Sequence, residues 1–287
     1  MNVRKLAPKS LRTTSRRAAV WWGERTADRR PAPDFLVIGG QRCGTTSLFR
    51  ALLAHPQIRR AQLHKGVNYF DLDYARGESW YRGHFPARST ADDLRVFDAS
   101  GYYMFHPQAP GRIVRDLPGV RLIAMVRDPV ERAYSAFKHE LARGYEWEHS
   151  FARAIELEDA RLEGEVERMM ADPSYQSFNH RHHAYRRRGE YARLLEPFIE
   201  GLGRDRLLII ESESFFAEPE MEFQRIIDFL DIAPTMPERF DRYNARPGDG
   251  LDAEVAERLR SHYETHDAAL GDLIGHTPFW RASDVLG

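Results

Sequence analysis

The sequence of 287 residues has a single cysteine, Cys43, which excludes an internal disulfide bond and fits a reducing compartment. Lysine is also scarce, with four residues, so the basic side chains are almost all arginines. No apolar run approaches the roughly 20 residues that span a bilayer, and the apolar patch Ala18–Trp22 is too short for a secretory signal. We therefore expect a cytoplasmic protein without a transmembrane segment.

Charge of one sign is lacking as well, because 42 basic residues balance 43 acidic ones. This balance excludes a global polycation for nucleic acid, so any basic site must be local. Residues 1–33 are the exception, with nine basic and two acidic side chains. We interpret them as a flexible, solvated N-terminal arm. Contact of this arm with an acidic membrane surface or a partner is the alternative.

Residues 34–287 are expected to form one domain, because they contain no internal repeat and no low-complexity block. Three short apolar runs have the pattern of strands buried on both faces: Phe35–Ile38, Arg121–Val126 and Arg206–Ile210. Helical patterns lie between them, among them one long helix from His149 to Met170. This alternation predicts an α/β fold with a central parallel sheet flanked by helices.

A glycine-rich turn follows the first predicted strand and precedes an amphipathic helix. Gly39 and Gly44 have the spacing of the phosphate loop G-x-x-x-x-G-K-[ST], but Thr45 occupies the lysine position. Inward-facing backbone N–H groups and the positive end of the helix dipole both favour an anion there. Three hydroxyl side chains stand at this helix start, those of Thr45, Thr46 and Ser47. The pattern predicts a P-loop-type anion site, and an ordinary glycine turn is the alternative.

The cations near this loop are arginines. Arg42 lies inside the loop, and Arg127 follows the second strand, where a P-loop kinase or NTPase would place a carboxylate for magnesium. Ligands of open α/β sheets collect at the carboxyl ends of the strands, which is where Arg127 stands. We therefore expect an anionic leaving group without an obligatory metal, with a magnesium-dependent kinase or NTPase as the rival hypothesis.

Two blocks of the sequence resemble sulfotransferases that use 3′-phosphoadenosine-5′-phosphosulfate (PAPS), in the bacterial branch similar to heparan sulfate and other carbohydrate enzymes. The block Gln41–Thr46 resembles their loop Q-[KR]-[SCT]-G-[ST]-[ST], and "RDPVERAYS" from Arg127 resembles their 3′-phosphate motif. The resemblance implies that Arg42 contacts the 5′-phosphosulfate, while Arg127 and Ser135 bind the 3′-phosphate. The other implied nucleotide contacts are Gln41, Cys43, Gly44, Thr45, Thr46, Ser47 and Tyr191.

The resemblance breaks at the catalytic base, because Gly66 stands where the heparan-type enzymes have a glutamate. The sequence offers His64, Asp98 and the pair His139–Glu140 as substitutes, and we favour Asp98, at the end of the predicted strand "LRVFD". Lys65 keeps its family position and is expected to hold the sulfonate or the substrate.

The function that the resemblance implies is transfer of a sulfuryl group from PAPS to a hydroxyl of a carbohydrate, glycolipid or other small acceptor, releasing adenosine 3′,5′-bisphosphate (PAP). A non-catalytic PAPS- or PAP-binding relative is a further alternative, since Gly66 cannot accept a proton. The basic tract Asn179–Arg188 is interpreted as a cleft lining or a solvated stretch, without a metal. Cys43 is expected to be a packing residue.

Overall fold

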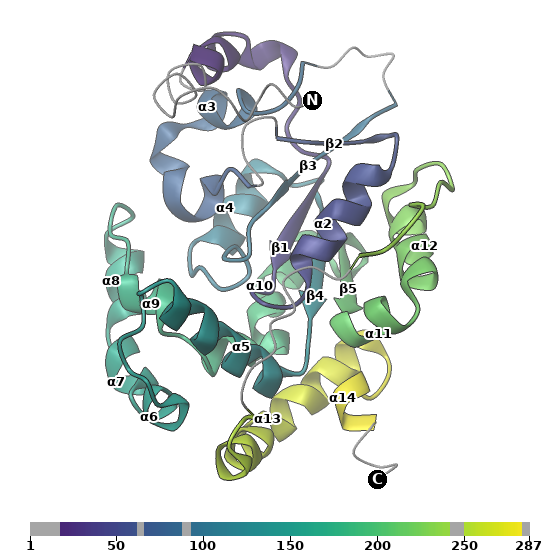
Figure 1. Ribbon diagram of the computed structural model, residues 1–287. Helices are drawn as coiled ribbons and strands as arrows, with labels where there is room; N and C mark the ends of the chain where they lie inside the picture. Colours follow the sequence, from purple (N-terminus) through teal and green to yellow (C-terminus); the bar gives the residue numbers. More distant parts are fainter. Residues whose placement is uncertain (1–17, 62–65, 88–92, 242–249, 283–287) are drawn as a thin grey trace, which may run out of the picture.

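The computed structural model describes residues 18–61, 66–87, 93–241 and 250–282, and its centre is a five-stranded parallel sheet (Figure 1). The strands are β1 (Phe35–Gly39), β2 (Ile58–Arg60), β3 (Arg95–Ala99), β4 (Arg121–Val126) and β5 (Leu207–Glu211). Each pairing in the order β2-β3-β1-β4-β5 is parallel. The predicted fold class is therefore confirmed.

The helices connect these strands and extend the chain beyond them. Besides the helical residues 18–25, the α-helices of the described part are α2 (Thr45–Ala54), α3 (Glu78–Arg82), α4 (Ala109–Asp116), α5 (Pro129–Ala142), α6 (Phe151–Glu156), α7 (Glu158–Leu162), α8 (Glu165–Ala171), α9 (Phe178–His182), α10 (Tyr191–Leu202), α11 (Ser212–Ala217), α12 (Pro219–Leu230), α13 (Ala253–Ile274) and α14 (Phe279–Ala282). The short helical turns are η2 (Ala27–Arg29), η3 (Tyr69–Asp73), η4 (Tyr74–Arg76), η5 (Arg187–Gly189) and η6 (Arg204–Arg206).

The chain order around β1 determines where a ligand can bind. From β1 the chain moves to one side of the sheet, through β2 and β3, and then crosses to the other side with β4 and β5. The strand order thus reverses at β1, and open α/β sheets bind ligands at such a switch point, beyond the carboxyl ends of the strands. The loops after β1 and β4 meet there, because these two strands are neighbours.

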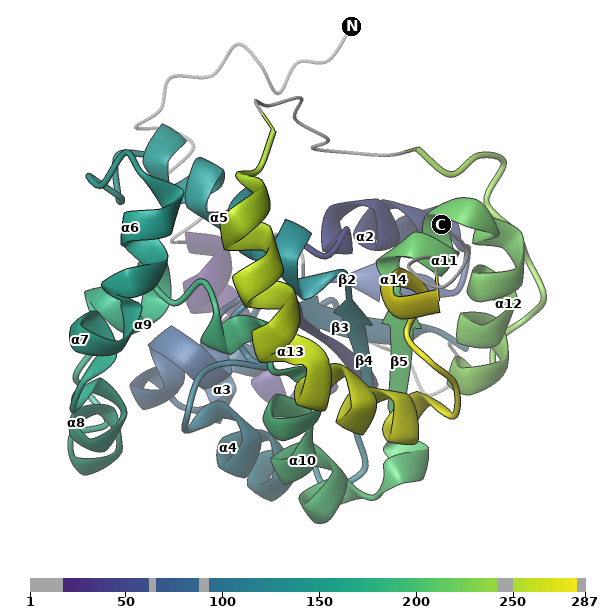
Figure 2. The same cartoon turned by 90° about the horizontal axis from the view of Figure 1, so that it is seen from below.

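Helices cover both faces of the sheet. Seen along the edge of the sheet, α2 and α12 lie on one side of the strands and α4 and α10 on the other (Figure 2). The main core contains the fully buried residues of β1 and β4. A second cluster joins α5, α6 and α13 through residues such as Phe137, Phe151 and Tyr263.

Two elements differ from the sequence expectation. The helix expected from His149 to Met170 is wrong as one element, because the chain forms α6, α7 and α8 there. A left-handed turn at Gly164, with φ 70°, separates the last two. The edge strand β2 was not expected, since it has only three residues and one of them is exposed.

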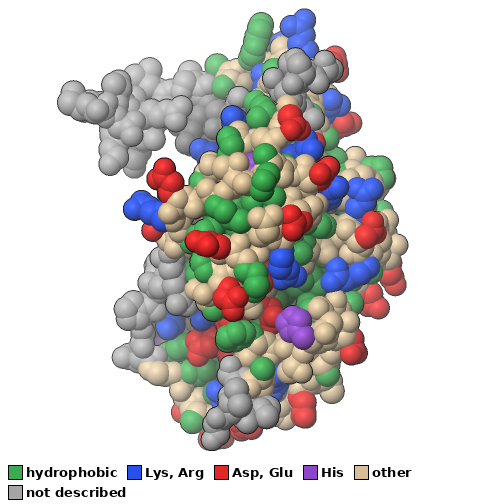
Figure 3. Space-filling model, turned by 90° about the vertical axis from the view of Figure 1, so that its right-hand side faces the viewer, with side chains coloured by type: hydrophobic (Ala, Val, Ile, Leu, Met, Phe, Trp, Pro, Cys, Tyr) green, Lys and Arg blue, Asp and Glu red, His purple; other side chains and the backbone are tan. Residues whose placement is uncertain are grey.

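The described part of the predicted arm contacts the domain. Residues 18–25 are helical, and the Arg82 guanidinium donates a 2.8 Å hydrogen bond to the Arg30 carbonyl. The boundary at residue 33 stays a prediction. None of the described helices is long and apolar enough to cross a membrane. On the face shown in Figure 3, acidic and basic side chains are interspersed, as expected from the charge balance.

Candidate active site

The glycine-rich loop leaves the sheet through a change of register between Val37 and Gly39. Arg42 has φ 70° and Gly44 has φ 82°, so the chain turns sharply before α2 begins at Thr45. At Gly44 a side chain would also lie 3.1 Å from Ser212 Oγ and from the Phe216 ring. The loop therefore needs glycine at this position, and it places the N-terminus of α2 at the switch point.

Cys43 lies inside this loop and is fully buried. Burial raises the pKa of its thiol to about 11, against the opposing effect of Arg132. The thiol is therefore protonated at neutral pH, which agrees with a packing role. Ser47 is buried as well, whereas Thr45 lines a pocket at the mouth of the loop.

The two sequence motifs meet in space. Arg42 Nε donates a 3.0 Å hydrogen bond to Ser135 Oγ, across 93 positions of sequence. Arg127 Nη1 lies 3.4 Å from the Arg42 carbonyl oxygen, and Tyr191 Oη donates a 2.8 Å hydrogen bond to the Arg127 carbonyl. Asp128 caps α5 by accepting hydrogen bonds from the N–H groups of Val130 and Glu131, which fixes the helix that carries Ser135.

A buried polar network links the loop to α5 and to the turn before α10. Gln41 donates a 3.1 Å hydrogen bond to Glu140 and accepts one of 2.7 Å from Arg188. His182 contacts the other Glu140 oxygen at 2.9 Å. Sequence reasoning placed Gln41 here but missed Arg188, because it interpreted the basic tract around this residue as a cleft lining or a solvated stretch. Glu140 belongs to the pair His139–Glu140 that the sequence offered as a base. Both of its carboxylate oxygens are occupied in this network, one by Gln41 and the other by His182.

Two arginines beneath the loop are buried without an ion pair to any described carboxylate. Arg132 has no exposed surface, and its Nη2 donates to the Tyr185 carbonyl while Nε and Nη1 have no hydrogen-bond partner. Arg188 lies over the rings of Tyr102 and Phe105, and desolvation lowers its pKa to about 10. Together they give the loop a positive environment.

Asp98, the favoured base, is enclosed by the protein. It has no exposed surface, and its carboxylate accepts four hydrogen bonds. Their donors are Val67 N (2.9 Å), Ala99 N (2.8 Å), Tyr103 Oη (2.7 Å) and Tyr81 Oη (3.3 Å). A carboxylate this enclosed positions the chain after Gly66, and we do not retain it as the base. His64 and Lys65 lie outside the described residues.

Position 66 has no room for the family's glutamate. A Cβ atom on Gly66 would lie 1.9 Å from the Ala99 carbonyl oxygen, which is part of the backbone. The glycine is therefore required by the close approach of two chain segments.

A pocket of about 210 Å³ opens beside the loop, and it is lined by Val37, Thr45, Gly66, Asn68, Ala99, Ser100 and Gly101. Behind Ser100 stands Asp71, a residue that sequence reasoning did not single out. Ser100 Oγ donates a 2.7 Å hydrogen bond to Asp71 Oδ2, and the buried Oδ1 has no partner. Burial raises the Asp71 pKa to about 7, although the Ser100 hydrogen bond acts to lower it.

The fold and this site define an α/β protein with a phosphate-type loop at the switch point of its sheet. The model of the sulfotransferase domain matches residues 32–246, well over half of the chain, and the chain belongs to this family. The resemblance noted in the sequence is thereby confirmed.

Individual relatives agree with this assignment. The bifunctional heparan sulfate N-deacetylase/N-sulfotransferase 4 of Mus musculus is 28% identical over 220 residues, which cover 75% of this chain and 24% of that protein. The chain therefore spans about a quarter of such relatives. The heparan sulfate glucosamine 3-O-sulfotransferase 3B1 of Homo sapiens is 24% identical, covering 86% of this chain and 65% of that one. A solved sulfotransferase from Alicyclobacillus acidocaldarius has a TM-score of 0.68 at 25% identity, covering 86% of this chain and 97% of that chain.

Proposed function

We propose that the chain transfers a sulfuryl group from PAPS to a hydroxyl group of a carbohydrate or glycolipid acceptor and releases PAP. One observation carries the proposal, the 3.0 Å contact between Arg42 of the loop and Ser135 of the second motif. Because the motifs touch, one nucleotide can place its 5′-phosphosulfate on the loop and its 3′-phosphate against Arg127 and Ser135. A saccharide acceptor is supported by relatives named for heparan sulfate.

In the proposed reaction the acceptor oxygen attacks sulfur as the bond between sulfur and the 5′-phosphate oxygen breaks. The electron pair remains on that oxygen, so negative charge develops there. The loop N–H groups and Arg42 stabilise this charge, as in phosphoryl transfer. Arginine is a poor proton donor with a pKa above about 12, so this contribution is electrostatic.

The acceptor hydroxyl must also lose a proton. Ser100 lines the pocket beside the loop and already donates its proton toward Asp71. We propose that Ser100 Oγ takes the acceptor proton while its own proton passes to Asp71 Oδ2. A pKa of about 7 leaves Asp71 partly ionised at neutral pH, as a general base requires.

The test has two stages. Thermal melting with PAP, with ADP, and with ATP plus magnesium measures which nucleotide binds, because a ligand at a hundredfold excess over its Kd adds about 2.7 kcal/mol of stability. Stabilisation by PAP but not by ATP plus magnesium is expected, and the reverse pattern would favour a kinase. Transfer of labelled sulfate from PAPS to oligosaccharide acceptors then tests catalysis.

A non-catalytic nucleotide-binding protein is the second candidate, favoured by the absence of space for a base at Gly66. It predicts PAP binding without transfer to any acceptor or to a cell extract. Loss of transfer on Ser100→Ala, with PAP binding retained, would exclude it.

A further inference from the structure

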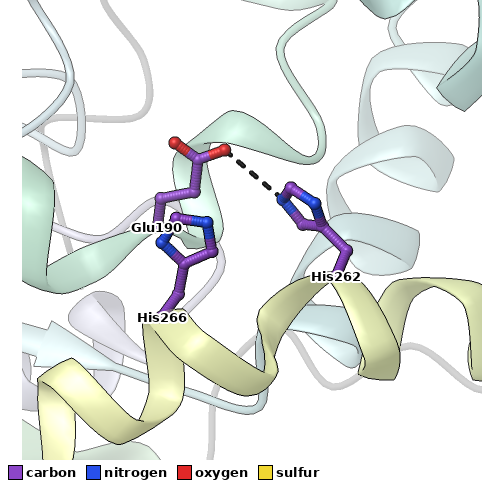
Figure 4. A group of neighbouring side chains, drawn as sticks. All are labelled: Glu190, His262 and His266. Atoms are coloured by element: carbon purple, nitrogen blue, oxygen red, sulfur yellow. Dashed lines mark ion pairs between the residues drawn. The ribbon is translucent and has the colours of Figure 1, made fainter.

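Two histidines one helical turn apart on α13 face a glutamate at the start of α10. Among the described residues, Glu190, His262 and His266 form a group in which one potential ligand atom of each lies within 4.8 Å of the others. Figure 4 shows His262 and His266 side by side on the helix, with the Glu190 carboxylate directed to His262. Histidines at i and i+4 project from the same helix face, so α13 presents both rings to one point.

The geometry is close to that of a metal centre with two imidazole ligands and one carboxylate. Zinc bonds to nitrogen and oxygen of about 2.0–2.2 Å place tetrahedral ligand atoms about 3.3–3.5 Å apart. His262 Nε2 is 3.4 Å from Glu190 Oε1, so this edge already has the required length. The ligand atom of His266 lies within 4.8 Å of the other two, and its partly exposed side chain has room to adjust.

His262 also has a ring nitrogen available to a metal ion. Its buried Nε2 has no hydrogen-bond partner of good geometry. The two oxygens of Glu190 have different partners. Oε2 forms an ion pair with Arg193 at 3.0 Å, and Oε1 faces His262.

We propose that Glu190, His262 and His266 bind one divalent ion of the zinc type, with a water molecule as fourth ligand. The ion would connect α13 to the turn that carries Arg188 and Tyr191, a connection that Tyr263 already makes through its 2.7 Å hydrogen bond to the Arg186 carbonyl. The site lies outside the pocket beside the loop, and this inference does not rest on the proposed function.

Two nearby arginines oppose the metal charge and therefore limit its affinity. Arg186 is held by Asp159 at 2.6 Å, and Arg193 is paired with the second oxygen of Glu190. Because Asp159 offsets the Arg186 charge, the repulsion weakens binding without preventing it. The competing explanation of this arrangement is an ordinary ion pair between a protonated His262 and Glu190. In that case His266 would not contribute to the interaction.

The experiment uses the full chain without a polyhistidine tag, after treatment with a chelator. Calorimetric titration with zinc should show one saturable site, and cobalt should give the visible absorption of a tetrahedral complex. At a hundredfold excess of zinc over its Kd, the melting temperature should rise by about 5–10 °C.

His266→Ala is the decisive variant, because its partly exposed ring contacts His262 and makes no described ion pair. Zinc affinity should fall at least tenfold in this variant and in Glu190→Gln. His276→Ala is the matched control, since it removes a histidine 3.5 Å from a glutamate, Glu211, and no third ligand stands there among the residues that the structure describes. Unchanged zinc binding in His266→Ala, an equal loss in His276→Ala, or the absence of saturable binding in the wild-type chain would each overturn the proposal.

Discussion

The Asp71 carboxyl allows a quantitative test, because its stability effect and its proposed proton-transfer role can be measured on the same variant. Its pKa in the folded chain is about 7, compared with an ordinary value of 3.8. One pKa unit corresponds to about 1.4 kcal/mol, so the shift amounts to about 4 kcal/mol. The folded state holds the proton more tightly, and the associated stability is present below pH 3.8 and is lost as the pH rises through about 7.

Asp71→Asn removes this titration while keeping the size of the side chain and an acceptor for Ser100. Of the total of about 4 kcal/mol, about 3 kcal/mol falls between pH 5 and pH 8. We therefore expect the unfolding free energy of the wild-type chain to fall by about 3 kcal/mol more than that of the variant over this range, as measured by urea denaturation. Sulfuryl transfer in the variant should drop by about 10²–10⁴, the usual contribution of a general base.

Two further variants control this result. Asp205→Asn changes an exposed carboxylate and should leave the pH dependence of stability unchanged. Ser100→Ala should lower activity, and it should move the pH-dependent loss of stability to higher pH, because the Ser100 hydrogen bond lowers the Asp71 pKa. If Asp71→Asn and the wild-type chain have parallel stability curves from pH 5 to 8, Asp71 does not titrate in this range and the proton relay is wrong.

Three other substitutions test the remaining parts of the site. Arg42→Ala should lower turnover by about 10²–10³, while Arg42→Lys should keep much of it; near-normal activity of the alanine variant in a PAP-release assay would remove the electrostatic role. Arg127→Ala should weaken PAP binding more than tenfold but scarcely affect ADP, and calorimetry showing equal losses for both nucleotides would contradict a 3′-phosphate site. Gly66→Ala should lower the melting temperature by several degrees, because the new Cβ meets the Ala99 carbonyl at 1.9 Å, whereas Gly111→Ala, with nothing within 4 Å, should not.

The sequence was sufficient for the parts of the fold that depend on local patterns. The runs that became β1, β4 and β5 are apolar on both faces, and the turn after β1 carries its glycines at fixed spacing. The strand β2 was not predicted, because three residues with one buried side chain show no hydrophobic periodicity. The division of residues 149–170 into three helices follows from turns such as the one at Gly164, which interrupts a hydrophobic spacing that continues past it.

The positions of site residues were predictable only where the interacting side chains lie close together in the sequence. Arg127 and Ser135 were placed together because eight residues separate them. The enclosure of Asp98 was not predictable because three of its four hydrogen-bond donors come from other segments, and a strand end alone does not reveal whether a carboxylate faces a cleft or the core. Asp71 was missed for the same reason, since its partner Ser100 is 29 positions away.

The net charge of −1 conceals a local excess of positive charge beneath the loop. Arg132 and Arg188 are buried there without an ion pair to a described carboxylate, and desolvation of Arg188 is strong enough to lower its pKa. Glu140 and Glu158 act on Arg188 without a direct ion pair, so its buried charge is only partly compensated and packing alone does not explain its position. An anionic nucleotide at the loop would supply the missing negative charge. The same burial reduces screening by salt, so the electrostatic attraction between this region and a bound nucleotide should persist at ionic strengths that weaken surface ion pairs.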